Sequence, residues 1–285
     1  MTIWHAILLG LVQGLTEFLP ISSTAHLTLT GKLFGLVNPE RPDEWTAFIA
    51  VIQLGTLISV IIYFWADILA ITRGFVTANM ALLRRRQPDP QSRQQAKLGW
   101  LVIIGTIPIA IVGLAFKDII EGSLTKNLWV ISGSLIGLAL VLTVAEFVST
   151  KRRGMDDLRV RDAMAVGIAQ VFALIPGSSR SGTTITGGLF SGLTRETAAR
   201  FSFLLSIPAI AASGLLELPK ALGSVHTDWV NIVTATLVSA VSGYLAIAFL
   251  LRFLQRHTTF VFVAYRIILG LVLIALLATS RVGAN

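Results

Sequence analysis

The chain of 285 residues contains no cysteine, and this absence excludes several kinds of chemistry at once. Disulfide bonds, a thiolate nucleophile and cysteine-ligated zinc all need a residue that the sequence lacks. Charge is also scarce, because only 13% of the residues are charged while 54% are hydrophobic. Soluble domains carry roughly 25% charged residues. The composition therefore indicates a protein that resides in a membrane.

Six apolar stretches are long enough to cross a bilayer, since about 20 apolar residues span its hydrocarbon core. They cover residues 46–64, 98–116, 127–145, 201–216, 229–251 and 258–279. Two further apolar segments, 3–34 and 163–193, are interrupted near the middle, and each predicts a re-entrant pair of half-helices. We therefore expect an all-α integral membrane protein with six transmembrane helices and two re-entrant helix-loop-helix segments.

The order of these segments repeats. A re-entrant pair is followed by three spans in residues 1–150, and the same order returns in residues 157–285. Because each half contains an odd number of spans, the second half must start from the opposite face of the membrane. This predicts an inverted-topology repeat whose two halves form one membrane domain.

The net charge of +8 arises from 23 Lys and Arg against 15 Asp and Glu. The basic residues gather in short loops without interleaved aromatic residues, so we expect no nucleic-acid partner. Loops 67–97, 150–162 and 252–257 carry about twice as many of them as the opposite face, whose basic residues are Lys32, Arg41, Lys117, Lys126, Lys220 and Arg281. By the positive-inside rule, the first face is cytoplasmic and both termini lie outside.

A hydroxyl-rich sequence interrupts each re-entrant segment. Pro20-Ile21-Ser22-Ser23-Thr24-Ala25-His26 returns, altered, as Pro176-Gly177-Ser178-Ser179-Arg180-Ser181-Gly182. Each copy ends an apolar run that bears a glutamine, Gln13 or Gln170. Such broken backbone cannot face lipid, where its N–H and C=O groups would have no partner. Two copies suggest two halves of one polar cavity inside the membrane.

The first copy brings acid, alcohol and imidazole together. Gln13 and Glu17 lie four residues apart and so project from one face of a helix. A carboxylate within an apolar stretch usually faces a functional cavity, where Glu17 can be a metal ligand or a general base; the alternative is a structural ion pair. Ser23 needs a base to become a nucleophile, and His26 or Glu17 can serve.

The second copy has the composition of an anion site. Its glycines let backbone N–H groups approach an anion, and a helix that starts there directs its positive dipole end toward the same anion. Arg180 adds a two-pronged guanidinium suited to phosphate oxygens. In the alternative interpretation, Arg180 only neutralises Glu17. Arg266 lies inside the last span, and the sequence suggests no role for it.

Both motifs together resemble the undecaprenyl-diphosphate phosphatase family, also called bacitracin-resistance proteins, over essentially the whole chain. The resemblance implies hydrolysis of a polyprenyl diphosphate, undecaprenyl diphosphate, to the monophosphate, which recycles the lipid carrier of cell-wall synthesis. It also implies a multi-pass protein of the bacterial inner membrane, a divalent cation (Mg²⁺ or Ca²⁺), a possible homodimer, and an active site open to the outer face.

Carried over by position, the family's motifs identify Glu17, Ser23, His26 and Arg180 as catalytic, with Glu17 also as metal ligand. Gln13 occupies a place where the family has Glu or Gln, and Ala25 stands where many members have Gly. Around the catalytic group we expect a shell of substrate-binding residues, namely Gln13, Ser22, Thr24, Gly177, Ser178, Ser179, Ser181 and Thr184.

Two questions stay open at the level of sequence. The nucleophile can be Ser23, His26 or a metal-activated water. The chain can also be a transporter or lipid-carrier flippase, because inverted repeats with broken helices are the usual architecture of secondary transporters. The crowding of nucleophile, base and anion-binding residues into the two breaks argues for the enzyme, since transport needs no activated hydroxyl.

Overall fold

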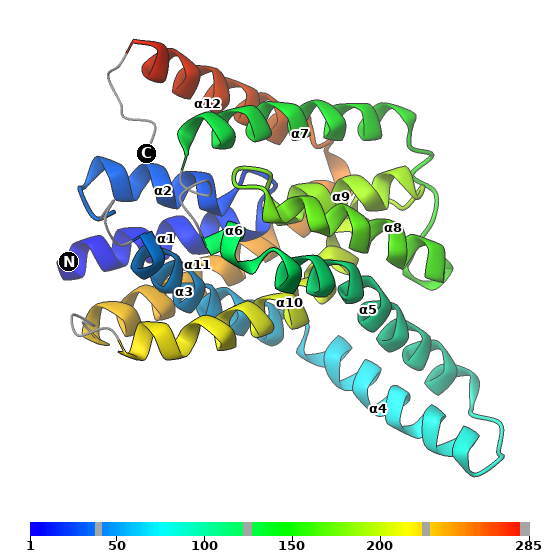
Figure 1. The fold of residues 1–285 in the computed structure, drawn as a ribbon. Helices are drawn as coiled ribbons and strands as arrows, with labels where there is room; N and C mark the ends of the chain where they lie inside the picture. Colours follow the sequence, from blue (N-terminus) through cyan, green and yellow to red (C-terminus); the bar gives the residue numbers. More distant parts are fainter. Residues whose placement is uncertain (38–41, 122–126, 224–228, 280–285) are drawn as a thin grey trace.

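A computed structural model of the chain describes residues 1–37, 42–121, 127–223 and 229–279, so Arg41, Lys126 and Arg281 lie outside the described residues. These ranges form helices and no β-strand (Figure 1). The α-helices are α1 (Ile3–Phe18), α2 (Ser23–Leu33), α3 (Pro42–Tyr63), α4 (Trp65–Leu83), α5 (Pro90–Ala115), α6 (Lys117–Glu121), α7 (Leu128–Val148), α8 (Val160–Val171), α9 (Arg180–Phe190), α10 (Arg195–Gly223), α11 (Trp229–Arg256) and α12 (Phe260–Ala278), with short 3₁₀ turns at Met155–Asp157 and Phe172–Leu174.

Within the described ranges, 7 helices are long and apolar enough to cross a membrane: α3, α4, α5, α7, α10, α11 and α12. Six of them coincide with the six predicted spans, and the all-α membrane fold is confirmed. The additional helix is α4.

The prediction of a loop over residues 67–97 is wrong. Helix α4 and the first turns of α5 pair there as an antiparallel hairpin, with the rings of Phe75 and Trp100 5.0 Å apart. Asp67, at the start of α4, forms an ion pair of 2.8 Å with Arg200 near the start of α10, on the basic face. Figure 1 shows α4 continuing in the direction of α3, so α4 does not run back across the bundle. Scattered polar residues such as Arg73 hid this helix in the sequence.

Two hairpins enter the bundle from opposite ends, and their tips meet in its middle (Figure 1). In the first, α1 has 16 residues and α2 has 11, both too short to cross about 30 Å of hydrocarbon. The rings of His5 and Phe34 lie 5.3 Å apart, so α2 returns to the end where α1 began. In the second hairpin, Arg153 donates both to Asp162 at the start of α8 (2.9 Å) and to the carbonyl of Ser191 after α9 (2.8 Å).

The two hairpins have closely similar backbone conformations. Ser22 and Ser179 each cap the returning helix from a left-handed conformation, at φ 77° and φ 68°. Their hydroxyls accept from N–H groups three residues on, at 3.3 and 3.2 Å. The same difference in residue number separates the two caps, the two glutamines Gln13 and Gln170, and the two positive-φ glycines Gly35 and Gly192. This correspondence supports two repeats; their division into 1–150 and 157–285 stays a prediction.

The same shift corrects the sequence alignment by one residue. Alignment of Pro20 with Pro176 pairs Ser23 with Ser179, whereas the caps pair Ser22 with Ser179 and Ser23 with Arg180. Glu17 then corresponds to Leu174. The two breaks therefore have the same backbone conformation but different side chains at equivalent positions.

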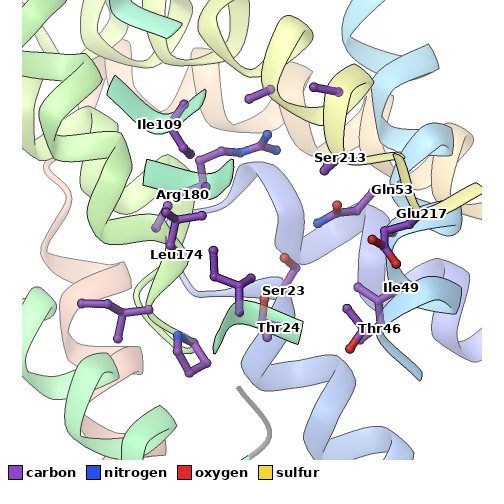
Figure 2. A pocket seen from close by; sticks show the side chains of 18 of the residues that line it. Ser23, Thr24, Thr46, Ile49, Gln53, Ile109, Leu174, Arg180, Ser213 and Glu217 are labelled. Atoms are coloured by element: carbon purple, nitrogen blue, oxygen red, sulfur yellow. The ribbon is translucent and has the colours of Figure 1, made fainter. Parts of the chain in front are cut away.

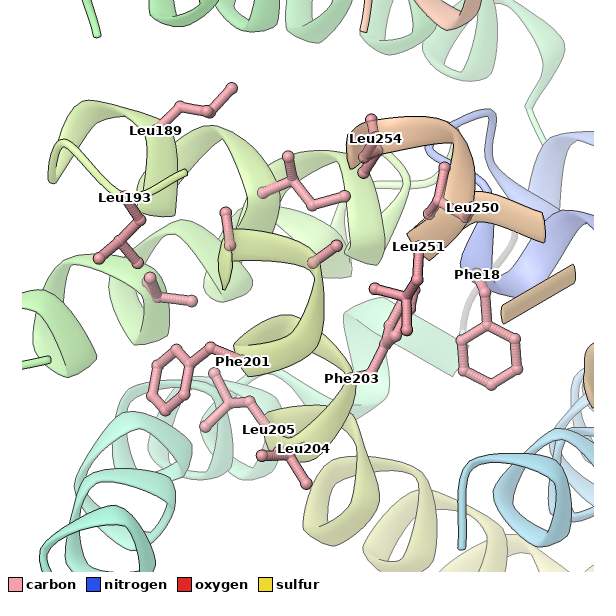
Figure 3. Packing of buried hydrophobic residues seen from close by; sticks show 14 of the residues in the cluster. Phe18, Leu189, Leu193, Phe201, Phe203, Leu204, Leu205, Leu250, Leu251 and Leu254 are labelled. Carbon is pink, nitrogen blue, oxygen red and sulfur yellow. The ribbon is translucent and has the colours of Figure 1, made fainter. Parts of the chain in front are cut away.

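Small residues and one apolar cluster hold the hairpins in place. Helix α1 lies against α11 so closely that a Cβ on Gly14 would come 2.0 Å from Ser242 Oγ, the type of contact that small residues allow between membrane helices. At the end of α1, the ring of Phe18 packs edge-on against Phe203 of α10, with centroids 5.2 Å apart. Figure 3 shows both rings within the buried cluster to which α9, α10 and α11 contribute side chains. The tip of the first hairpin is thus tied to the second repeat.

Candidate active site

Glu17 is the centre of the polar group where the two breaks meet. Its Oε2 accepts hydrogen bonds from Gln13 Nε2 at 2.9 Å and from Ser23 Oγ at 2.7 Å. Its Oε1 accepts from the guanidinium of Arg180. The Glu17 side chain is only 3% exposed. The structure thus brings together the acid, the alcohol and the guanidinium that the sequence predicted as one site.

Helix geometry explains this convergence. Gln13 and Glu17 are one turn apart on α1. After the break, Ser23 is the first residue of α2, and Arg180 is the first residue of α9, so both side chains leave from the tips of their hairpins. The hydroxyl of Ser181 donates to the carbonyl of Leu19 at 3.0 Å and so joins one break to the other.

A cavity of about 450 Å³ opens beside this group. Of the predicted site residues, those on its wall are Glu17, Ser22, Ser23, Thr24, Gly177, Ser179 and Arg180. Figure 2 shows Ser23 and Arg180 directed into the cavity. The rest of the wall is mainly apolar, from α3, α5 and α10, and it extends to Trp45, Lys117 and Glu217 near the ends of α3, α5 and α10.

The other predicted substrate-binding residues lie behind this wall. Gln13 is fully buried behind Glu17. Ser178 donates to the carbonyl of Phe172 at 2.7 Å, and Thr184 donates to that of Arg180 at 2.7 Å. Ser181 is occupied by Leu19, as described above. In this structure these hydroxyls bind backbone and shape the breaks.

His26 is directed away from the cavity, toward α12. Its Nδ1 lies 2.6 Å from the carbonyl oxygen of Ser22, and its Nε2 lies 2.7 Å from the hydroxyl of Tyr265. A carbonyl only accepts, so Nδ1 carries hydrogen. In the neutral ring, Nε2 accepts from Tyr265, and no nitrogen is left for Ser23. Glu17, not His26, therefore accepts the hydrogen bond of the Ser23 hydroxyl.

Two polar residues near the site were not predicted from the sequence, and a third, Arg266, was given no role. Gln53 of α3 lines the cavity and is directed into it (Figure 2); an amide within the apolar stretch 46–64 was the available signal. Tyr265 is the partner of His26, and no local pattern could have indicated a contact so distant along the chain. Arg266 was noticed as an intramembrane charge but had no assigned partner.

The described residues contain no cluster of three or more His, Cys, Asp or Glu side chains that could enclose a metal. Glu17 nevertheless has a neighbour that could share a metal ion with it, since Oε1 of Gln13 is buried without a hydrogen-bond partner. Carboxylate and amide oxygens are the ligands that Mg²⁺ and Ca²⁺ prefer, and Mg²⁺ often uses only one or two protein carboxylates. These residues fit a cation that a phosphate-bearing ligand helps to bind.

Fold and site define a multi-pass membrane protein with a buried charged site where two inverted helical hairpins meet. A family profile described as bacitracin resistance protein BacA matches residues 6–272, and the chain belongs to this family.

Among curated relatives, an undecaprenyl-diphosphatase of Syntrophobacter fumaroxidans is 59% identical over 271 residues, 95% of each chain. Undecaprenyl-diphosphatases of Prosthecochloris aestuarii and Chloroherpeton thalassium are 49% and 50% identical over 100% of both chains. The similarity therefore extends over both repeats.

Gly177 supports the second break by its lack of a side chain, and we predict that Gly177→Ala destabilises the protein. Its φ is 88°, and a Cβ there would lie 2.3 Å from Ser134 Oγ and 2.5 Å from the carbonyl oxygen of Ile131. Left-handed strain and the clash should together cost about 3 kcal/mol, measured as a lower midpoint of thermal unfolding in detergent.

Gly137→Ala is the matched control, because no atom lies within 4 Å of a Cβ at that helical position. Its midpoint should stay the same or rise slightly. Equal midpoints for the two variants would contradict the close packing of Gly177 on α7.

Proposed function

We propose that this protein is a polyprenyl-diphosphate phosphatase. It hydrolyses undecaprenyl diphosphate to undecaprenyl phosphate and inorganic phosphate, and so recycles the lipid carrier of cell-wall synthesis. The observation that carries the proposal is the contact of Glu17 with both Ser23 and Arg180 at the wall of a membrane cavity. The family membership and the names of its relatives agree with this activity.

Arg180 binds the terminal phosphate in this proposal. Its side chain is only 16% exposed, so its electrostatic attraction for an anion is little screened by water. A phosphate that takes over donors of Arg180 weakens the pairing of Arg180 with Glu17. Substrate binding thereby frees the carboxylate to act as a base.

Ser23 is the proposed nucleophile. Its Oγ forms a bond to the terminal phosphorus while the bond from that phosphorus to the bridging oxygen breaks, and undecaprenyl phosphate leaves with the electron pair. The Ser23 proton passes to Glu17 Oε2, which already accepts from this hydroxyl at 2.7 Å. A water oxygen then bonds to the phosphoserine phosphorus while the bond from that phosphorus to Ser23 Oγ breaks; Glu17 gives its proton to Ser23 Oγ and takes one from the water. Inorganic phosphate leaves, and Glu17 releases the remaining proton to solvent.

Glu17 and Gln13 Oε1 would hold the divalent cation, Mg²⁺ or Ca²⁺. When bound, the cation neutralises charge that develops on the phosphate oxygens. His26 keeps the carbonyl of Ser22 and the start of α2 in place, so its contribution in this scheme is to orient Ser23.

We further propose that the site opens to the outer face of the inner membrane. The cavity extends toward Lys117 and Glu217, at the face opposite the loops rich in basic residues. The positive-inside rule makes those loops cytoplasmic. The long prenyl tail can stay in the bilayer while only the head group enters. A homodimer, implied by the family resemblance, stays a prediction.

Removal of Arg180 should strongly reduce phosphate release from undecaprenyl diphosphate by the purified protein in detergent. We predict a loss of about 100-fold or more in kcat/KM for Arg180→Ala. Arg180→Lys should be nearly as damaging, because a point charge loses the two-pronged contact. A chelator should stop the reaction, and added Mg²⁺ or Ca²⁺ should restore it.

Micelles have no compartments, so catalysis in detergent separates an enzyme from a transporter. Absence of phosphate release by the wild-type protein with cation present would remove the proposed activity. Normal kcat/KM in Arg180→Lys would contradict the two-pronged contact of Arg180 but not the proposed activity.

Ser23→Ala should lower kcat on the order of 1,000-fold, and rapid acid quenching of the wild-type protein with substrate labelled at the terminal phosphate should trap a phosphoserine at position 23. Label on His26 would identify the imidazole as nucleophile. Near-normal turnover of Ser23→Ala would leave direct attack by water as the route.

The absence of cysteine makes the orientation testable with single substitutions. Leu33 and Leu83 are exposed leucines at the C-terminal ends of α2 and α4, 71% and 84% exposed. In intact spheroplasts, a membrane-impermeant maleimide should label Leu33→Cys and spare Leu83→Cys. Permeabilised membranes are the control, in which both should react. The reverse pattern would invert the proposed topology.

A further inference from the structure

Arg266 of α12 is a buried cation that the scheme above does not use. It is 0% exposed, and no ion pair involves it among the described residues. Its Nε and NH1 groups have no hydrogen-bond partner. An intramembrane cation is costly, and such residues are commonly functional. Its NH2 group contacts carbonyls of the second break and, at 3.4 Å, the carbonyl of Ser134 on α7.

Three consecutive carbonyls of this break face the α7–α12 side. The carbonyl of Pro176 accepts from Ser134 Oγ of α7. The carbonyl of Ser178 accepts from Arg266 NH2 at 2.9 Å, and that of Gly177 lies 3.5 Å from the same nitrogen. Helices α7 and α12 contribute nothing to the cavity wall. These carbonyls therefore point away from the cavity.

In a trans peptide the C=O and the following N–H point in opposite directions, and the described chain has no cis peptide. The N–H groups of Gly177 and Ser179 are consequently turned toward the cavity, whose wall both residues form. Neither N–H donates within the described part of the chain, whereas that of Ser178 is used by the carbonyl of Ile175 at 3.2 Å. Backbone N–H groups that are close together and directed to the same side can bind an anion.

We propose that Arg266 is a positioning residue for the phosphate site. It holds the carbonyls of Gly177 and Ser178, so that the Ser179 N–H, supported by that of Gly177, donates to oxygens of the terminal phosphate beside Arg180. The adjacent Tyr265 holds the first break through His26. Consecutive residues of α12 thus fix both breaks. This inference depends on the proposed function, since it concerns the same site.

The test compares Arg266→Met with wild-type protein in detergent, with kcat/KM for undecaprenyl diphosphate and the inhibition constant of inorganic phosphate as readouts. Loss of oriented N–H donors should lower kcat/KM about 100-fold and raise the inhibition constant of phosphate about tenfold or more. Arg266→Lys keeps one donor near Ser178, so its kcat/KM and its inhibition constant should lie between those of the wild-type protein and Arg266→Met. Ser134→Ala, which frees only the carbonyl of Pro176, should have a smaller effect of the same kind.

Arg195→Met is the matched control. Arg195 forms a largely buried pair with Glu146, at 2.7 Å, and neither residue lines the cavity. It should lower the thermal midpoint but leave the inhibition constant of phosphate unchanged. An unchanged inhibition constant in Arg266→Lys and Ser134→Ala would overturn the positioning role, even if Arg266→Met does not fold. Wild-type activity in the same assay tests the proposed function separately.

Discussion

The ion pair between Glu17 and Arg180 is the interaction on which the site depends. Each charge lies within membrane-embedded structure, where an isolated ion costs several kcal/mol. Each is supplied by a different hairpin, and the hairpins enter from opposite ends of the bundle. Neither charge is tolerable without the other or a ligand that replaces it. The pair therefore couples assembly of the two repeats to assembly of the site.

Divergence between two equivalent breaks makes this arrangement possible. Both breaks use a serine cap in a left-handed conformation and return as helices of 11 residues. At matching positions, however, one break has Ser23 where the other has Arg180, and Glu17 corresponds to Leu174. A strictly repeated sequence would place like charges face to face, which is unfavourable in a medium of low dielectric constant. The asymmetry places the carboxylate of Glu17 and the hydroxyl of Ser23 on one hairpin and the guanidinium of Arg180 on the other.

The surrounding helices determine how firmly this geometry is held. Phe18 packs on Phe203, so the apolar core shown in Figure 3 reaches the tip of the first hairpin. On the other side, Ser134 of α7 and Arg266 of α12 bind the backbone of the second break. Several hydroxyls that looked like ligand donors in the sequence, such as those of Ser178 and Thr184, instead satisfy backbone carbonyls. At membrane depth, a broken helix needs such partners before it can offer any group to a ligand.

The sequence by itself determined the class of fold, the two breaks and the identity of the charged residues. Hydropathy, helix-breaking residues and charge in apolar surroundings are local properties, and they can be read without coordinates. The sequence did not reveal α4, because the polar residues of this helix lower its mean hydropathy. It also did not reveal the one-residue shift between the breaks, because the alignment was based on the prolines and not on the helix caps. Only the tertiary structure decided that Glu17 contacts Ser23 while His26 contacts Tyr265, and that Arg266 faces the carbonyls of the second break. These are contacts between segments far apart in the chain, and their geometry depends on how every helix packs.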